Sequence, residues 1–155
     1  MQERFMRRAI ALSLENIRSG RGGPFAAVVV RGDEIIAEGT NQVTSTNDPS
    51  AHAEMLAVRA ACHALKHFQL AACEIYTSCE PCPMCLGLIY WARPDKVYYA
   101  NTVEDAAAIG FDDSRIYREL ASPPAARSIA MVQMLRNEAL ASFRLWQAKP
   151  DKIPY

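Results

Sequence analysis

The sequence lacks an excess of charge of either sign, and it lacks a long apolar run. Lys plus Arg and Asp plus Glu each number 17 in 155 residues, so the formal net charge is zero, and neither sign forms a long block. Binding to nucleic acids is driven largely by clustered Lys and Arg, so the composition argues against a nucleic-acid partner. No apolar stretch approaches the length of a membrane span, which excludes a membrane partner.

Two further features are missing: an even cysteine count and the start of a signal peptide. The five cysteines are an odd number, which together with a metal site points to a reducing compartment. Residues 1–4 carry charges where the apolar core of a signal peptide would begin. We therefore expect a cytoplasmic protein. The length suits one ordinary domain, and no repeat, linker or low-complexity segment divides residues 1–155.

Two short motifs carry residue types that bind metal ions: His-Ala-Glu, and later in the chain Pro-Cys-Pro-Met-Cys. They supply His52, Cys82 and Cys85 as three ligands and Glu54 as a carboxylate that need not be one. A structural zinc site closes its fourth position with another Cys or His, whereas a catalytic site leaves it open. The motifs together match the signature of zinc deaminases. The sequence therefore predicts one catalytic Zn²⁺ per chain.

The spacing of these residues predicts their local geometry. Cys82 and Cys85 are three apart, so they share one face at the beginning of a helix, where prolines 81 and 83 fit the first turn. His52 and Glu54 are two apart, which would point them to nearly opposite sides of a regular helix. At least one of them must lie in the irregular entry to its helix, and the sequence leaves open which. A CxxC pair alone could also be a redox pair.

Hydrophobic periodicity and turn residues predict alternating helices and strands. The predicted helices cover residues 2–19, 51–65, 81–91, 105–110, 112–120 and 138–149. The predicted strands cover residues 25–30, 35–41, 74–77, 96–100 and 128–135. The first two strands form a hairpin, and the strand-to-helix order that follows implies a partly parallel sheet. Ligands of such folds collect at the carboxyl ends of strands, where the metal motifs lie.

With these residues in view, the chain resembles the cytidine deaminase superfamily, and within it more closely the bacterial guanine deaminases. The resemblance covers nearly the whole length. It rests on the zinc motif and on Asn41, Tyr155 and the stretches 22–25, 47–54, 76–87, 90–94 and 110–114. The zinc motif is shared by the superfamily and indicates the chemistry. The Phe-Asp-Asp-Ser stretch within 110–114 and the C-terminal tyrosine favour guanine.

The resemblance implies a fold, an assembly and a reaction. The fold is a three-layer α/β/α sandwich with a mixed five-stranded sheet. The assembly is a homodimer with exchanged C-terminal segments, in which residues 150–155 cover the partner's site, although such a terminus could also simply fray. The reaction is zinc-dependent hydrolytic deamination of guanine to xanthine and ammonia. The alternatives are deamination of tRNA adenosine, cytosine or an aminotriazine. A non-enzymatic zinc module would not need Glu54.

Site residues follow with different support. Glu54 is expected to shuttle protons. The resemblance favours Asn41 as a donor to a base carbonyl, although Asn often bonds its local backbone. Phe25 could stack on the purine or belong to the core. Asp113 could accept from the N–H groups of guanine and carry protons, or cap a helix. Tyr155 could exclude water from the pocket.

Overall fold

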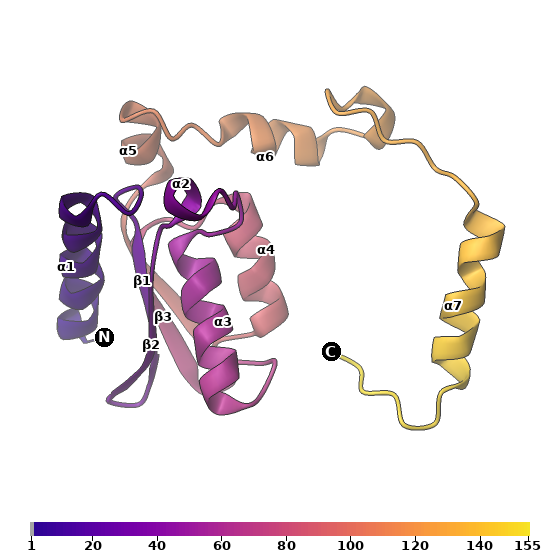
Figure 1. Ribbon diagram of the computed structural model, residues 1–155, viewed down its shortest axis with the longest axis horizontal. Helices are drawn as coiled ribbons and strands as arrows, with labels where there is room; N and C mark the ends of the chain where they lie inside the picture. Colours follow the sequence, from indigo (N-terminus) through magenta and orange to yellow (C-terminus); the bar gives the residue numbers. More distant parts are fainter. Residues whose placement is uncertain (1) are drawn as a thin grey trace. The chain divides into compact units, whose positions relative to one another are not determined.

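The computed structural model describes residues 2–155, which separate into two compact units, one ending at Asp113 and one spanning Ser114–Tyr155 (Figure 1). The first unit is an α/β fold built on a mixed sheet with the strand order β2-β1-β3-β4. Its strands are β1 (Ala26–Arg31), β2 (Glu34–Thr40), β3 (Cys73–Cys79) and β4 (Lys96–Asn101). β1 pairs antiparallel with β2 and β3, and β3 pairs parallel with β4. The predicted hairpin and partly parallel sheet are confirmed.

Helices lie on both faces of this sheet (Figure 1). Helix α1 (Glu3–Ser19) lies on one face, and α3 (Ala53–Leu65) and α4 (Pro83–Ala92) lie on the other. Successive β1 side chains point to opposite faces, so Val28 and Val30 join the α1 cluster while Ala27 and Val29 join the α3 cluster. Both faces of β1 are therefore buried, which explains its continuous apolar run.

Helix α1 ends as predicted at Gly20, whose φ of 68° is the left-handed conformation that glycine adopts easily. Its buried face does not include every apolar residue of the helix. Ile17 is 50% exposed, whereas Asn16 is fully buried. A polar side chain therefore occupies a core position of this helix.

The predicted fifth strand is wrong: among the described residues the sheet has four strands, and residues 128–135 form no regular element. Their apolar composition suits a strand, but a strand needs a neighbour for its backbone hydrogen bonds. The Ser128 N–H donates to the Glu119 carboxylate and not to another strand. A short helix that was not predicted, α2 (Val43–Thr46), lies between β2 and α3.

After β4 the chain is mostly helical. Helix α5 (Val103–Ala108) begins at a capping box in which Thr102 and Asp105 bond each other's backbone N–H. The second unit contains α6 (Ser114–Ala121), a short 3₁₀ turn (Pro124–Ala126) and α7 (Arg136–Ala148). No residue from 114 to 155 is buried. In the described residues, no helix combines the length and the apolar character needed to cross a membrane.

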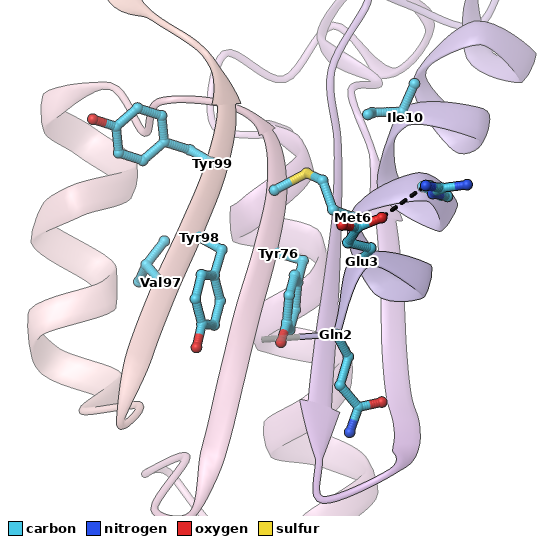
Figure 2. A pocket seen from close by; sticks show the side chains of 9 residues that line it. Gln2, Glu3, Met6, Ile10, Tyr76, Val97, Tyr98 and Tyr99 are labelled. Carbon is cyan, nitrogen blue, oxygen red and sulfur yellow. Dashed lines mark hydrogen bonds and ion pairs between the residues drawn. The ribbon is translucent and has the colours of Figure 1, made fainter.

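A pocket of about 530 Å³ lies in the first unit between α1 and the β4 side of the sheet (Figure 2). Tyr76 and Tyr98 stack along its floor with their ring centroids 4.7 Å apart. Met6 and Ile10 of α1 form the opposite wall. The surface beside the edge strand is thus apolar and aromatic.

Candidate active site

Three side chains at the carboxyl-end edge of the sheet are positioned to hold a metal ion. His52 Nδ1 lies 3.5 Å from the Sγ atoms of both Cys82 and Cys85, and the three ligand atoms lie within 4.8 Å of one another. Zinc bonds of about 2.3 Å to sulfur and about 2.0 Å to nitrogen, at a tetrahedral angle, separate the two ligand atoms by about 3.5 Å. The residues therefore fit a zinc ion with a fourth position left open.

The irregular entries to two helices bring these ligands together. His52 is the N-cap of α3 and has an extended backbone, so it is His52 rather than Glu54 that lies in the irregular entry. Cys82 is likewise the extended N-cap of α4, with Pro83 in the first turn and Cys85 inside the helix. The prediction that both cysteines lie on a helical face is wrong for Cys82. Their expected place at a helix N-terminus is confirmed.

The thiols at this site differ from ordinary cysteines. A hydrogen bond from Cys85 lowers the pKa of Cys82 well below its usual range, and the neighbouring His52 acts in the same direction. The same shared proton raises the pKa of Cys85. The thiolate is the form that binds metal. By contrast, burial raises the pKa of Cys79 to about 11, and its Sγ faces the Thr102 carbonyl oxygen at 3.5 Å, so Cys79 is a buried thiol rather than a ligand.

Glu54 lies in the first turn of α3 and is only 5% exposed. Cys85 Sγ is 3.4 Å from Glu54 Oε2, so the carboxyl adjoins the ligands. Thr77 Oγ1 on β3 donates to Glu54 Oε1 at 2.8 Å. Burial raises the pKa of Glu54 above its usual range, which the bond from Thr77 opposes. Burial and proximity leave a carboxyl suited to moving protons beside the metal ligands.

Sequence reasoning missed Thr77. Strand alternation could have found it, because Ile75 packs against the α3 side of the sheet and Thr77 points the same way. A polar residue at a buried strand position needs a hydrogen-bond partner, and here that partner is Glu54.

Asn41 and Phe25 lie beside one another next to the metal ligands. The Asn41 N–H donates to the Phe25 carbonyl oxygen at 3.0 Å, and the following residue, Gln42, donates to the carbonyl of Ala51, which precedes His52. The Phe25 ring meets the Phe111 ring edge to face, with centroids 4.9 Å apart. The Phe25–Phe111 pair was not predicted, although both residues belong to the stretches that carry the family resemblance.

The remaining predicted site residues lie in different units. Asp113 is partly buried, and burial together with the negative charge of Cys82 raises its pKa. Tyr155 belongs to the second unit, where its side chain is 71% exposed.

Residues 1–101 match the family model of the cytidine and deoxycytidylate deaminase zinc-binding region. The chain belongs to this deaminase family. Both the predicted superfamily and the predicted zinc site are thereby confirmed.

Two relatives and one solved structure show how far the similarity extends along the chain. This chain is 52% identical over 153 residues to guanine deaminase of Bacillus subtilis strain 168, and the match covers 99% of this chain and 98% of the relative. The X-ray structure of guanine deaminase from Bacillus subtilis matches with a TM-score of 0.97 and 51% identity, over 100% and 99% of the two chains. A tRNA-specific adenosine deaminase of Aquifex aeolicus is 42% identical over 77 residues, 50% of this chain and 51% of that one.

Proposed function

We propose that this deaminase converts guanine and water into xanthine and ammonia. The observation that carries the proposal is the buried Glu54 carboxyl beside three metal ligands, because a purely structural zinc site does not need an unligated carboxyl. The choice of guanine rests on the likeness to a guanine deaminase, which extends over both units. The sequence likeness to the tRNA-specific adenosine deaminase of Aquifex aeolicus covers half of the chain.

His52, Cys82 and Cys85 would hold zinc, which when bound supplies a hydroxide nucleophile near neutral pH. Glu54 takes the proton of the attacking water and gives it to a ring nitrogen of guanine. After attack at C2, Glu54 passes the proton of the newly added hydroxyl group to the departing amine, so that the C2 carbonyl of xanthine forms and the amine leaves as ammonia. Thr77 orients the carboxyl during these transfers by donating to one of its oxygens.

Four residues are proposed to bind the base. Asn41 donates its amide N–H to the C6 carbonyl, and Phe25 stacks on the ring beside Phe111. Asp113 accepts from the amino and ring N–H groups and helps to carry protons from the leaving ammonia. Tyr155, contributed by the C-terminal tail, excludes water from the pocket. These contacts together would distinguish guanine from bases that lack its carbonyl or its amino group.

Conversion of guanine to xanthine, followed by ultraviolet absorbance with the purified, zinc-loaded protein, tests the proposal. We expect turnover that disappears in Glu54→Ala. A folded, zinc-loaded protein without turnover would contradict the choice of guanine. Adenosine in a tRNA anticodon stem-loop, cytosine and an aminotriazine are then the substrates to compare, because they require the same chemistry in a differently shaped pocket.

We also propose a homodimer in which the C-terminal segments are exchanged. Apolar residues of the second unit are strongly exposed within the single chain, with Ile129, Val132, Phe143 and Leu145 between 69% and 80% exposed. The first unit presents an unpaired β4 edge and the tyrosine-lined pocket beside it (Figure 2). A second chain that lays its apolar α7 against this edge and pocket would bury both surfaces. In this assembly residues 1–155 of each chain form one deaminase domain, and residues 150–155 cover the site of the partner.

Gel filtration and activity measurements test this assembly with the full chain and a chain ending at Lys149. We expect both to be dimers, with the shortened chain losing activity because its tail no longer covers the partner's site. Two monomers of equal activity would contradict the proposal.

A cytoplasmic location is consistent with the five cysteines, none of which is paired in a disulfide.

A further inference from the structure

Asn16 is a buried polar residue on the core face of α1. Its side chain is fully buried, on the same helical face as Phe5, Ala9 and Leu12. Asn16 Oδ1 is the one buried side-chain oxygen or nitrogen that lacks a hydrogen-bond partner among the described residues. An unpartnered buried amide oxygen is destabilising. The hydrogen bonds made by the other end of this amide have to offset that cost.

The amide nitrogen of Asn16 joins two segments that border the active site. Asn16 Nδ2 donates to the Gly23 carbonyl oxygen at 2.9 Å and to the Asn41 carbonyl oxygen at 2.8 Å. Both acceptors are carbonyls, so the orientation of this amide is determined. A single side chain thereby connects the loop before β1 with the residue that follows β2.

The same two segments also contact each other directly. Asn41 Oδ1 accepts from the Gly23 N–H at 3.2 Å and from the Val43 N–H at 3.4 Å. A Cβ on Gly22 would lie 2.1 Å from the Asn41 carbonyl oxygen, so only glycine permits this approach. Because both backbone groups hold the oxygen of the Asn41 amide, its nitrogen points away from them. Nδ2 is the donor end of this amide, so it is the end that can bind a carbonyl oxygen of a ligand.

We propose that Asn16 is a positioning residue that orients the Asn41 amide toward the C6 carbonyl of a 6-oxopurine. Asn16 touches neither the substrate nor the metal ligands. It donates to the Gly23 and Asn41 carbonyl oxygens and so fixes the loop whose Gly23 N–H binds the Asn41 side chain. This inference rests on the proposed function, since it assigns the recognition of the carbonyl to Asn41. It makes Asn16 a determinant of specificity rather than of the chemical step.

Two inhibitors that cannot be deaminated separate positioning from general structure. Hypoxanthine carries the C6 carbonyl, whereas purine lacks it. Asn16→Leu removes both donors at similar volume, and we expect it to raise the inhibition constant of hypoxanthine about tenfold while that of purine changes less than about twofold. Asn16→Ser retains one donor and should give a smaller shift of the same kind; it decides the question if Asn16→Leu does not fold.

Ser13→Ala is the matched control, because Ser13 is another buried polar residue of α1 and its hydroxyl donates only to the Ile10 carbonyl oxygen of the same helix. It should change neither inhibition constant. In an Asn41→Asp background, which keeps the oxygen but removes the donor, Asn16→Leu should add no further loss for hypoxanthine.

Equal weakening of both inhibitors by the Asn16 variants, or no effect on either one, would overturn the assignment. In both cases an active wild type keeps the proposed function intact. A wild type that is folded and zinc-loaded but does not turn over guanine would instead overturn the proposed function, and with it this inference.

Discussion

Val28 and Val29 in the first unit are fully buried between two helical layers, whereas Ile129, Val132 and Met134 in the second unit are 76%, 80% and 75% exposed. Both groups consist of apolar residues of similar size, so composition does not distinguish them. What differs is the neighbouring surface: β1 has strands on both sides and helices on both faces, whereas no strand among the described residues lies beside residues 128–135. An apolar segment becomes a strand only where another surface completes it.

The difference also divides the work of the chain. All three metal ligands, Glu54 and Thr77 belong to the first unit and are positioned by its sheet and two helix entries. The proposed contribution of the second unit is assembly and closure of the pocket. Chemistry and assembly should therefore respond to different substitutions, and the following predictions test that separation.

The largest effect is expected from Glu54→Ala in the first unit. The variant removes the group that transfers protons, so turnover of guanine should fall by about 10⁴-fold. The zinc content should stay near one ion per chain, because Glu54 is not one of the three clustered ligands. Steady-state rates and metal analysis check both statements. Glu34→Ala, which removes an exposed carboxylate of β2, serves as the control. A variant that loses zinc together with activity would show that Glu54 is a ligand.

The next effect concerns assembly and should arise in the second unit. Phe143 on α7 is 69% exposed in the single chain, and the proposed dimer would bury it. Phe143→Asp should then lower the free energy of unfolding by about 3 kcal/mol and shift the protein toward monomers. Denaturant unfolding and gel filtration measure the two quantities. Gln147→Asp on the same helix should leave both unchanged, and equal behaviour of the two variants would argue that α7 is not at an interface.

Whether a feature of the fold or the site could be predicted from the sequence depended on how far apart in the chain the contacting residues lie. The metal ligands and Glu54 were predicted because a catalytic zinc site requires particular residue types within short motifs. The fifth strand was predicted wrongly because residues 128–135 have the composition of a strand but lack a neighbour within the chain. Asn16 and Thr77 were missed because their roles arise from contacts across long sequence separations, with Asn41 and Glu54 respectively.

A smaller effect is expected from Thr77→Val, which keeps the shape of the side chain but removes the donor to Glu54 Oε1. The carboxyl loses the bond that orients it, so kcat should fall about tenfold while zinc content and the unfolding midpoint change little. Thr40→Val at the end of β2 is the matched control. If Thr77→Val retained the full kcat, the packing of α3 alone would suffice to orient Glu54.

The smallest effect is a change in how the unfolding free energy depends on pH in the alkaline range. It tests whether water is excluded from Tyr76 in the core of the first unit. Tyr76 packs between the rings of Phe5 and Tyr98, and its hydroxyl donates to Glu74 Oε2 at 2.8 Å. Burial and the bond to Glu74 raise the pKa of Tyr76 to about 12. In the unfolded chain a tyrosine ionises near pH 10, so above that pH the unfolded state releases a proton that the folded state keeps.

The contribution of Tyr76 to stability is therefore fully present below about pH 10 and declines by about 1.4 kcal/mol per pH unit up to about pH 12. Tyr76→Phe keeps the ring but cannot ionise, so its unfolding free energy should fall less steeply over this range, as urea titrations between pH 9 and about pH 11 would measure. Tyr90→Phe, at a side chain that is 75% exposed, should leave the wild-type slope unchanged. If the unfolding free energies of Tyr76→Phe and the wild type fell equally steeply with pH, water would have to reach the Tyr76 hydroxyl. The first unit would then be less completely buried at this pocket than it is at β1.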